Sequence, residues 1–306
     1  MLSELFCWAF FFLLPASFCG ETTPPDATLL RASSQAADLA FPAQSSMPSS
    51  VEVPRMAIFK PDGDGPFPGL VLFHQCAGLG AGRRPNHSML QWAHESVARG
   101  YAALLIDSLG PRGVDTVCFG PRGGVNFARG VKDALQAAEH LRKFDFVDAK
   151  RIALAGYSWG AMVGVLSSSK RWSTSLAPGE RFIAVVSFYP GCFTIRPQSG
   201  TPYEIVQPDI DRALLVLMGE LDNETPAGEC VAKLDAVKSS GAPVEWHVYP
   251  QTTHCWDCRQ LDNFSKIDVR GNRVTYRYSD AVTRDSARRM FEFLGKTMGD
   301  RQYPTN

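Results

Sequence analysis

The sequence has no excess of charge of either sign, because its 306 residues include 31 basic and 31 acidic side chains. A protein that binds nucleic acid or an anionic membrane over a broad surface carries a basic excess. The balance therefore excludes an extended basic surface for binding either partner.

Internal repeats are lacking too. The tetrapeptide Gly-Pro-Arg-Gly occurs at 110–113 and 120–123, which we interpret as a local echo within one loop.

Clustered metal ligands are also scarce. The chain has six scattered histidines and one Cys-x-x-Cys pair, formed by Cys255 and Cys258. A structural zinc site needs about four Cys or His ligands close together, and the sequence offers no second pair to complete one. The alternation of strands and helices described below is also not that of a thioredoxin, which argues against a redox pair. We therefore expect no metal and no cofactor.

The sequence contains no apolar run of transmembrane length. Leu5 to Phe18 is apolar but shorter than the roughly 20 residues that a helix needs to cross a bilayer. It predicts a signal peptide at 1–19, cleaved after Cys19, with an uncleaved apolar anchor as the alternative. Residues 20–49 are rich in Pro, Ser, Ala and Thr and predict a linker or loosely ordered arm. We expect a periplasmic or secreted protein with no stable membrane span after signal removal.

Residues 50–300 alternate between short apolar runs and amphipathic segments, which predicts one α/β domain. The apolar runs predict buried strands at 69–74, 101–106, 152–155, 182–188, 213–218 and 244–249. The helical segments are 126–143, 226–239 and 279–298, with a further helix around Met89, Trp92 and Val97. Strands that alternate with helices form a mostly parallel sheet with helices on both faces.

A Gly-Tyr-Ser-Trp-Gly motif at 156–160 follows one of these strands and precedes a helix-compatible segment. Strand, tight turn and helix in this order form the nucleophile elbow of an α/β-hydrolase fold. The two glycines leave room for the strained turn that exposes the serine. We therefore identify Ser158 as the candidate nucleophile, with an ordinary glycine-flanked turn as the alternative.

An acid and a base follow the serine in the chain order that this fold requires. Asp222 comes just after the strand 213–218, and His254 comes just after the strand 244–249. In such a sheet, active-site groups lie beyond the carboxyl ends of the strands. We expect Asp222 to orient the His254 imidazole, and His254 to take the hydroxyl proton of Ser158.

Glu220 and Glu224 lie on the same polar loop and are alternative acids, but the place of Asp222 on the exposed turn favours it. An oxyanion hole needs two backbone N–H donors. We assign one to Trp159, the residue after the nucleophile, and the other to Cys76, in the loop after the first buried strand.

Six cysteines remain once the two in the predicted signal peptide are removed, and an even number in an exported chain favours disulfides. Cys192 and Cys230 follow neighbouring strands. We predict a bridge between them that restrains the loop of Asp222. A further structural bridge is expected to involve Cys76 or Cys118.

Taken together, these motifs resemble the dienelactone hydrolase family over roughly residues 50–298. The segments that carry the resemblance are 74–78, 107–113, 156–160, 219–222 and 249–254. The founding enzymes of that family open a cyclic ester with Cys, Asp and His. Here Ser158 replaces the cysteine, and Gln75 stands where those enzymes have a glutamate that contacts it. The chain thus resembles the serine-bearing, exported branch of the family.

The resemblance further implies two arginines that bind a substrate carboxylate. Arg112 matches the first, although it could equally brace its Gly-Pro-rich loop. Cys258 stands where the second would fall, and Arg259 is one place further on, which argues against dienelactone itself as the substrate. The other candidate substrate-binding residues are Gln75, Tyr189 and Trp256. For the aromatic ones, core packing is the alternative.

We therefore expect a serine hydrolase that cleaves a small carboxylic ester or lactone through an acyl-enzyme on a Ser-His-Asp triad. A peptidase or amidase with the same triad is one alternative, although the short chain leaves little room for the cap that large substrates need. A catalytically silent binding protein is the other alternative. An intact set of Ser158, Asp222 and His254 argues against it.

Overall fold

The computed structural model describes residues 26–46, 53–80, 85–198 and 200–299. The expected signal peptide, 1–19, lies outside these residues. Among the helices that the structure does describe, none is both long enough and apolar enough to cross a membrane.

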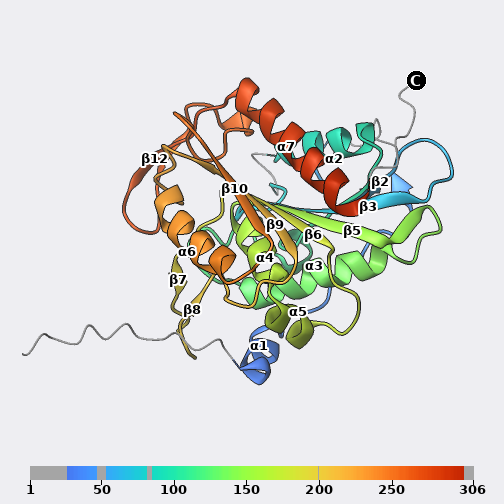
Figure 1. Ribbon diagram of the computed structural model, residues 1–306, viewed down its shortest axis with the longest axis horizontal. Coiled ribbons are helices and arrows are strands. Elements are labelled where there is room, and N and C mark those ends of the chain that lie inside the picture. Colours follow the sequence, from blue (N-terminus) through green and yellow to red (C-terminus); the bar gives the residue numbers. More distant parts are fainter. Residues whose placement is uncertain (1–25, 47–52, 81–84, 199, 300–306) are drawn as a thin grey trace, which may run out of the picture.

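Within the described residues, eight strands form the central sheet, in the order β1-β2-β4-β3-β5-β6-β9-β10 (Figure 1). Neighbouring strands run parallel except β2 and β4, which are antiparallel. The strands are β1 Ser45–Ser46, β2 Ala57–Phe59, β3 Phe67–Phe73, β4 Ala102–Leu105, β5 Val147–Tyr157, β6 Ala184–Phe188, β9 Ala213–Gly219 and β10 Val244–Tyr249. The predicted mostly parallel sheet is confirmed.

Helices cover both faces of the sheet, with α2 and α7 on one side and α3, α4, α5 and α6 on the other (Figure 1). The helices are α2 His87–Ala98, α3 Phe127–Leu141, α4 Trp159–Ser168, α5 Lys170–Leu176, α6 Ala227–Ser239 and α7 Asp280–Met298. Successive residues of a strand face opposite sides. In β5, Leu154 packs with the α3 and α4 side chains, whereas Ala153 and Ala155 pack with those of α2 and α7. Burial on both faces explains why the strand sequences are continuously apolar.

The register of the central strands brings their carboxyl ends to one edge of the sheet. Tyr157 of β5 pairs with Phe188 of β6, and Phe188 pairs with Leu217 of β9. Gly219, the last residue of β9, pairs with Tyr249, the last residue of β10. The loops that follow β5, β6, β9 and β10 therefore lie side by side, although they are far apart in the sequence.

The arm expected to be loosely ordered is structured in its described part, 26–46. Helix α1 (Ala27–Ser33) is capped by Asp26, whose side chain accepts a hydrogen bond from the Thr28 amide. Leu30 of this helix is buried in the core cluster on the α3 side of the sheet. The Pro- and Ser-rich composition predicted a linker because it offers few apolar side chains, but the order of the arm comes from its partners on the domain.

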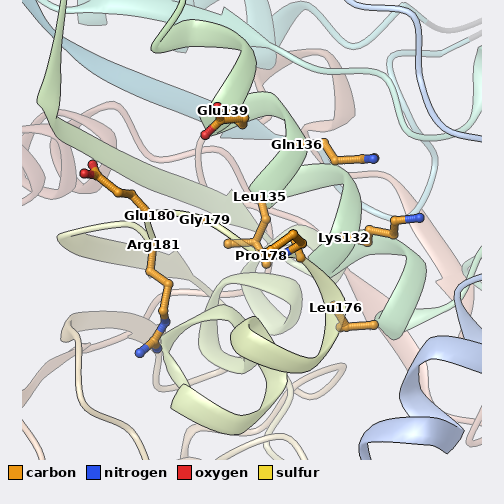
Figure 2. A pocket seen from close by; sticks show the side chains of 10 residues that line it. Lys132, Leu135, Gln136, Glu139, Leu176, Pro178, Gly179, Glu180 and Arg181 are labelled. Carbon is orange, nitrogen blue, oxygen red and sulfur yellow. The ribbon is translucent and has the colours of Figure 1, made fainter.

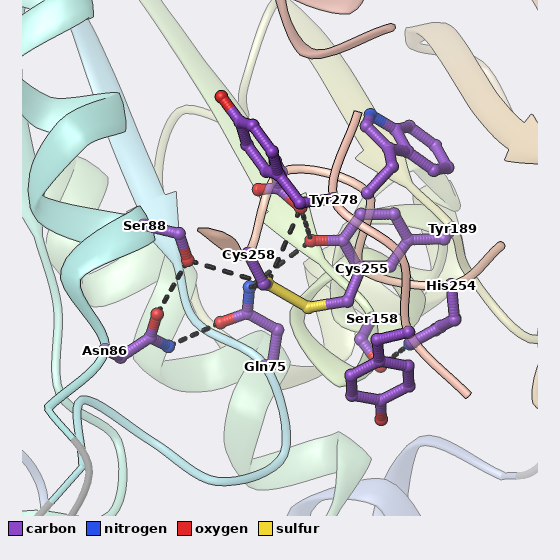
Figure 3. The surroundings of a disulfide bond; sticks show 12 residues. Gln75, Asn86, Ser88, Ser158, Tyr189, His254, Cys255, Cys258 and Tyr278 are labelled. Carbon is purple, nitrogen blue, oxygen red and sulfur yellow. Dashed lines mark hydrogen bonds between the residues drawn. A yellow bond between two sulfur atoms is a disulfide. The ribbon is translucent and has the colours of Figure 1, made fainter. Parts of the chain in front are cut away.

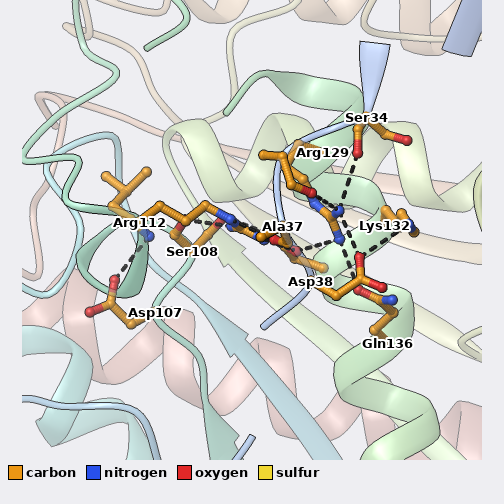
Figure 4. Close-up of polar contacts among 12 residues, drawn as sticks. Ser34, Ala37, Asp38, Asp107, Ser108, Arg112, Arg129, Lys132 and Gln136 are labelled. Carbon is orange, nitrogen blue, oxygen red and sulfur yellow. Dashed lines mark hydrogen bonds and ion pairs between the residues drawn. The ribbon is translucent and has the colours of Figure 1, made fainter. Parts of the chain in front are cut away.

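The main partner of the arm is Arg129 of α3, whose side chain is fully buried (Figure 4). Its Nη1 donates to the carbonyl oxygens of Ser34 and Ala36 at 3.1 and 2.7 Å. The same nitrogen lies 2.9 Å from a carboxylate oxygen of Asp38. A charged donor that is buried must be paired to be tolerated. The arm supplies the acceptors of Nη1, whereas Asp133 and Gln136 of α3 pair with Nη2.

Two small antiparallel pairs of strands were not predicted from the sequence. Among the described residues they are β7 (Thr194–Ile195) with β8 (Tyr203–Glu204), and β11 (Ser265–Ile267) with β12 (Arg273–Thr275). The β11–β12 hairpin lies in the segment between His254 and α7. Short strands with mixed exposure show too little alternation to be recognised in a sequence.

Disulfide bonds join all six cysteines that lie in the described ranges. The pairs are Cys76–Cys118, Cys192–Cys230 and Cys255–Cys258. The second pair connects the segment after β6 to helix α6, which follows the loop of Asp222. The first bridge holds the loop after β3, which carries the candidate oxyanion donor Cys76. The third bridge directly follows His254.

Replacing both Cys192 and Cys230 by serine is expected to lower the free energy of unfolding by about 3–4 kcal/mol in the chain-entropy account of disulfides. The bridge spans a sequence separation of 38 residues, so its loss gives the unfolded chain much more freedom. Urea unfolding of the variant and the wild type measures the difference. Alkylation of both cysteines in the unreduced wild-type protein would show instead that the bridge does not form.

Candidate active site

Ser158 lies in the turn between β5 and α4, with φ 52° and ψ −111°. A positive φ is strained for a residue other than glycine, and the surrounding backbone leaves no space for bulk. A Cβ atom on Gly156 would lie 2.1 Å from the carbonyl oxygen of Gly160, and one on Gly160 would lie 2.4 Å from that of Phe73. The two glycines of the motif are therefore required by close backbone approach.

The side chains of Ser158, His254 and Asp222 form a hydrogen-bonded line (Figure 3 shows the first two). His254 Nε2 lies 3.0 Å from Ser158 Oγ. On the other side of the ring, His254 Nδ1 lies 2.6 Å from Asp222 Oδ2. All three side chains are buried. The carboxylate therefore holds the proton of the ring on Nδ1 and leaves Nε2 free to accept the serine proton.

The Asp222 carboxylate is itself held in place by its own loop. Its Oδ1 accepts hydrogen bonds from the amides of Glu224 and Thr225 at 3.0 and 2.8 Å. The Thr225 hydroxyl donates to Oδ2 at 2.8 Å. The sequence analysis did not identify Thr225, although an Asp followed by a hydroxyl residue three places later is a recognisable turn pattern.

The environment of His254 favours its charged form. Burial acts to lower its pKa, but the negative charges of Asp222 and Glu224 and the hydrogen bond to Asp222 outweigh burial. The pKa of His254 is therefore raised above the ordinary value for histidine. Because the neutral ring is the form that accepts a proton, this form is lost as the pH falls through the raised pKa.

Two tyrosine rings flank the His254 ring. The ring of Tyr189 meets it edge to face at 4.6 Å between centroids, and the ring of Tyr276 lies at 5.6 Å. The Tyr189 hydroxyl donates to Asp257 at 2.7 Å, and burial raises the pKa of this hydroxyl well above its usual value. Tyr189 is fully buried, so in place of the expected contact with substrate it supports the histidine. Tyr276 was not identified from the sequence, which gives no local signal for it.

The Cys255–Cys258 disulfide directly follows His254 and contacts the loop after β3 (Figure 3). The Gln75 side-chain nitrogen lies 3.7 Å from Cys258 Sγ and 3.3 Å from the Tyr189 hydroxyl. The Gln75 side-chain oxygen accepts from Asn86 at 2.6 Å. Gln75 was expected to contact substrate, but it belongs to a buried polar network that joins the loop after β3 to the segment after His254.

Trp256 was also expected to line the substrate pocket, but its side chain is fully buried. Its indole nitrogen lies 3.3 Å from the Ser286 hydroxyl of α7. The alternative from the sequence, core packing, therefore describes Trp256. The chain direction after His254 turns this side chain into the core.

The backbone amides of Cys76, in the loop after β3, and of Trp159, directly after Ser158, are the two candidate donors to an oxyanion. Trp159 is the first residue of α4, where amides lack a partner within the helix. Among the described residues, neither amide has an acceptor. The Cys76 loop is held by its disulfide to Cys118 and by the Val117 amide, which donates to the Cys76 carbonyl at 2.9 Å.

Arg112 does not have the free guanidinium that substrate binding would require (Figure 4). The guanidinium lies 2.6 Å from an Asp133 carboxylate oxygen and donates to the carbonyl oxygens of Ser108 and Ala37. Its side chain is only 6% exposed. Arg112 therefore braces its loop against α3 and the arm, which was the alternative interpretation of its sequence position.

Arg259, the other arginine considered from the sequence, has an exposed side chain that lies over the Tyr278 ring.

Potential metal ligands meet at Cys255, Asp257 and Cys258, whose ligand atoms lie within 4.8 Å of one another. Both sulfurs are joined in a disulfide, and the Asp257 carboxylate accepts from Trp92 and Tyr189. These atoms are already engaged, so we assign no metal to them.

Two hollows lined by described residues lie away from Ser158, Asp222 and His254. One, of about 220 Å³, lies between α3 and the segment 176–181 (Figure 2). A second, of about 640 Å³, lies beside β10 and α7. Ser158, Asp222 and His254 line neither, so neither is the site of the chemistry described above.

Comparison with known proteins places these observations in a family. The model of the dienelactone hydrolase family matches residues 55–298. The chain is 26% identical over 165 residues to dipeptidyl-peptidase 5 of Porphyromonas gingivalis. That match covers 44% of this chain and only 22% of the peptidase.

Solved structures share the fold at low sequence identity. A putative dienelactone hydrolase from Klebsiella pneumoniae subsp. pneumoniae is 17% identical with a TM-score of 0.59, over 85% of this chain and 97% of that one. Esterase 2 of Thermogutta terrifontis, phosphonylated by cyclosarin, is 17% identical with a TM-score of 0.58, over 80% of this chain and 90% of that one.

Proposed function

The chain belongs to the dienelactone hydrolase family, and within it we propose a serine hydrolase that cleaves small carboxylic esters or lactones outside the cytoplasm. The observation that carries the proposal is the hydrogen-bonded line from Ser158 through His254 to Asp222 at the top of a strained elbow. A serine hydroxyl is a weak nucleophile unless an adjacent base takes its proton. This geometry supplies that base and a carboxylate that orients it.

Acylation follows from these positions. His254 Nε2 takes the proton of Ser158 while Oγ attacks the carbonyl carbon of the ester. The developing oxyanion accepts hydrogen bonds from the amides of Cys76 and Trp159, which are fixed before the substrate arrives. Asp222 stabilises the imidazolium. The imidazolium then returns the proton to the leaving alcohol, and an acyl group stays on Ser158.

Deacylation repeats the same steps with water as the nucleophile. His254 takes a proton from the water, which attacks the acyl carbon, and the proton then returns to Ser158 Oγ. The products are a carboxylic acid and the free enzyme. A lactone follows the same course, except that its alcohol and acid remain joined in one ring-opened product.

A peptidase or amidase on the same triad is the second candidate. The similarity to part of dipeptidyl-peptidase 5 favours it. The family match and the larger share of each chain covered by the esterase structure favour ester substrates. The disulfides of the described residues support an oxidising compartment, periplasmic or extracellular.

A fluorophosphonate probe is expected to label the wild-type protein at Ser158, because an activated serine attacks phosphorus as it attacks an ester carbonyl. Peptide mass mapping after labelling identifies the modified residue. The Ser158→Ala variant should take up no label, and turnover of short aryl esters, lactones and aminoacyl amides then ranks the substrate classes. A wild-type protein that takes no label would contradict the proposal, as would labelling at a different serine.

A further inference from the structure

The β11–β12 hairpin rests on the loop that carries Asp222. Asn223 of that loop donates to the Arg273 carbonyl oxygen of the hairpin at 2.9 Å. Arg270, at the tip of the hairpin, forms an ion pair at 2.8 Å with Glu229 at the start of α6. It also donates to the Glu224 carbonyl oxygen. The hairpin is thus fixed beside the acid of the proposed triad.

The contacts centre on the side chain of Glu224. Its Oε1 lies 2.8 Å from Nζ of Lys266 on β11, and its Oε2 accepts from the Tyr276 hydroxyl at 2.7 Å. The carboxylate is only 15% exposed. Glu224 was an alternative acid from the sequence, but its oxygens bind these hairpin groups, whereas Asp222 binds His254. The Tyr276 ring packs near the His254 ring and so links the two sites.

We propose that Glu224, held by Lys266 and Tyr276, is a positioning residue that places a second negative charge near His254 and so stabilises its imidazolium. The inference rests on the proposed function, because it takes His254 to be the base of a serine hydrolase. Lys266 opposes Glu224, because its positive charge acts against protonation of the ring. The hairpin thereby sets how strongly His254 holds a proton.

The charged and titratable groups around His254 come from several elements. They are Asp222 and Glu224 after β9, Tyr189 after β6, Asp257 after β10, Lys266 on β11 and Tyr276 after β12. Asp222 and Glu224 act to raise the pKa of His254, and Lys266 acts to lower it. The neutral tyrosines contribute packing. Glu224 and Lys266 are therefore a pair of opposite sign that can be removed one at a time.

The balance between the charges of Glu224 and Lys266 affects both the attack by Ser158 and the protonation of the resting His254 ring. His254 becomes an imidazolium as Oγ attacks, so a nearby negative charge stabilises the transition state. The same charge also protonates the resting ring at a higher pH, which removes the base. The largely buried Glu224 carboxylate supplies part of the transition-state stabilisation, and the positive charge of Lys266 limits how far the resting ring is protonated.

The rate of fluorophosphonate labelling as a function of pH tests this inference. The variants are Glu224→Gln and Lys266→Met, measured from about pH 5.5 to 9, the range around the ordinary histidine titration. In Glu224→Gln the acidic limb should shift to lower pH. The rate relative to the alkaline plateau should then rise about three- to tenfold on the acidic limb, as expected for the loss of one partly screened charge. In Lys266→Met the relative rate should fall on the same limb.

Glu220→Gln is the matched control, because the same change is made on the same loop at an exposed carboxylate that bonds to the Gln251 amide. Its pH profile should match the wild type. Tyr276→Phe keeps the ring on His254 and removes only the hydroxyl, so it is the milder variant if Glu224→Gln does not fold. Glu224 keeps its ion pair with Lys266 in this variant and stays charged, but without the hydroxyl donor its charge is less neutralised. This variant should therefore shift the acidic limb in the same direction as Lys266→Met, by a smaller amount.

Opposite shifts in the two charge variants support the inference, because a merely structural role would slow labelling without moving the acidic limb in opposite directions. Unchanged profiles in both variants, or shifts in the same direction, would overturn it. An unlabelled wild type would overturn the proposed function instead, so the two failures are distinguishable.

Discussion

Replacing Ser158 by alanine is expected to lower kcat/KM for an aryl ester by about a thousandfold or more, while the fold persists. In the proposed mechanism the hydroxyl is the group that becomes acylated, and the motif 156–160 contains no other serine, threonine or cysteine. Alanine fits the same strained turn because it is smaller than serine. The same loss is expected for His254→Ala, since the two residues act in one step. Steady-state hydrolysis and thermal unfolding measure the two quantities.

Two comparisons make this result specific. The double variant of Ser158 and His254 should be about as slow as either single variant, because residues that act as a unit are not additive. Ser240→Ala and His247→Ala, which change the same residue types outside the site, should keep the wild-type rate. Near wild-type turnover in Ser158→Ala would mean that the nucleophile has been assigned to the wrong residue.

Asp222→Asn is expected to lower kcat by about a thousand- to ten-thousandfold, because the amide selects the wrong tautomer of the imidazole. Asp222 Oδ1 accepts two backbone amides, so the oxygen of an asparagine would occupy that place. The side-chain NH₂ would then face His254 Nδ1. A donor there forces the ring proton onto Nε2, which can no longer accept the proton of Ser158.

The neighbouring carboxylates should matter far less to turnover. Glu220→Gln should stay within about twofold of the wild type, as surface changes usually do. Glu224→Gln should cost less than about tenfold on the alkaline plateau, because it acts on His254 through space. Parallel measurement of kcat for the three variants ranks the acids. A greater loss in Glu220→Gln than in Asp222→Asn would reverse the assignment of the acid.

The sequence alone was sufficient to predict the mostly parallel sheet with six of its strands, the helices α2, α3, α4, α6 and α7, and the three residues of the hydrogen-bonded line. Buried parallel strands are continuously apolar, so 152–155, 213–218 and 244–249 could be recognised without their partners. The elbow is a local structure that forces glycines at 156 and 160 through backbone contact. Active-site groups follow strand ends in this fold, which selected His254 among the histidines.

The residues around Ser158, His254 and Asp222 are placed by contacts that no local sequence pattern encodes. The sequence left Arg112 equally open to binding a substrate or bracing its loop, and only the contacts of its guanidinium with Asp133 of α3 and with the arm decide for bracing. Tyr189 and Trp256 follow strand ends as pocket residues would, yet the direction of the chain there buries both.

Tertiary structure alone also decided what supports the base. Tyr276 and Lys266 lie on a hairpin of short, mixed strands, and their effect on His254 depends on where that hairpin packs. The order of the arm likewise comes from Arg129, nearly a hundred residues away in the sequence. Local rules of backbone and burial determine the sheet and the strained turn at Ser158. The partners of a buried charge are determined by packing between segments that are distant in the sequence, so only the folded chain reveals them.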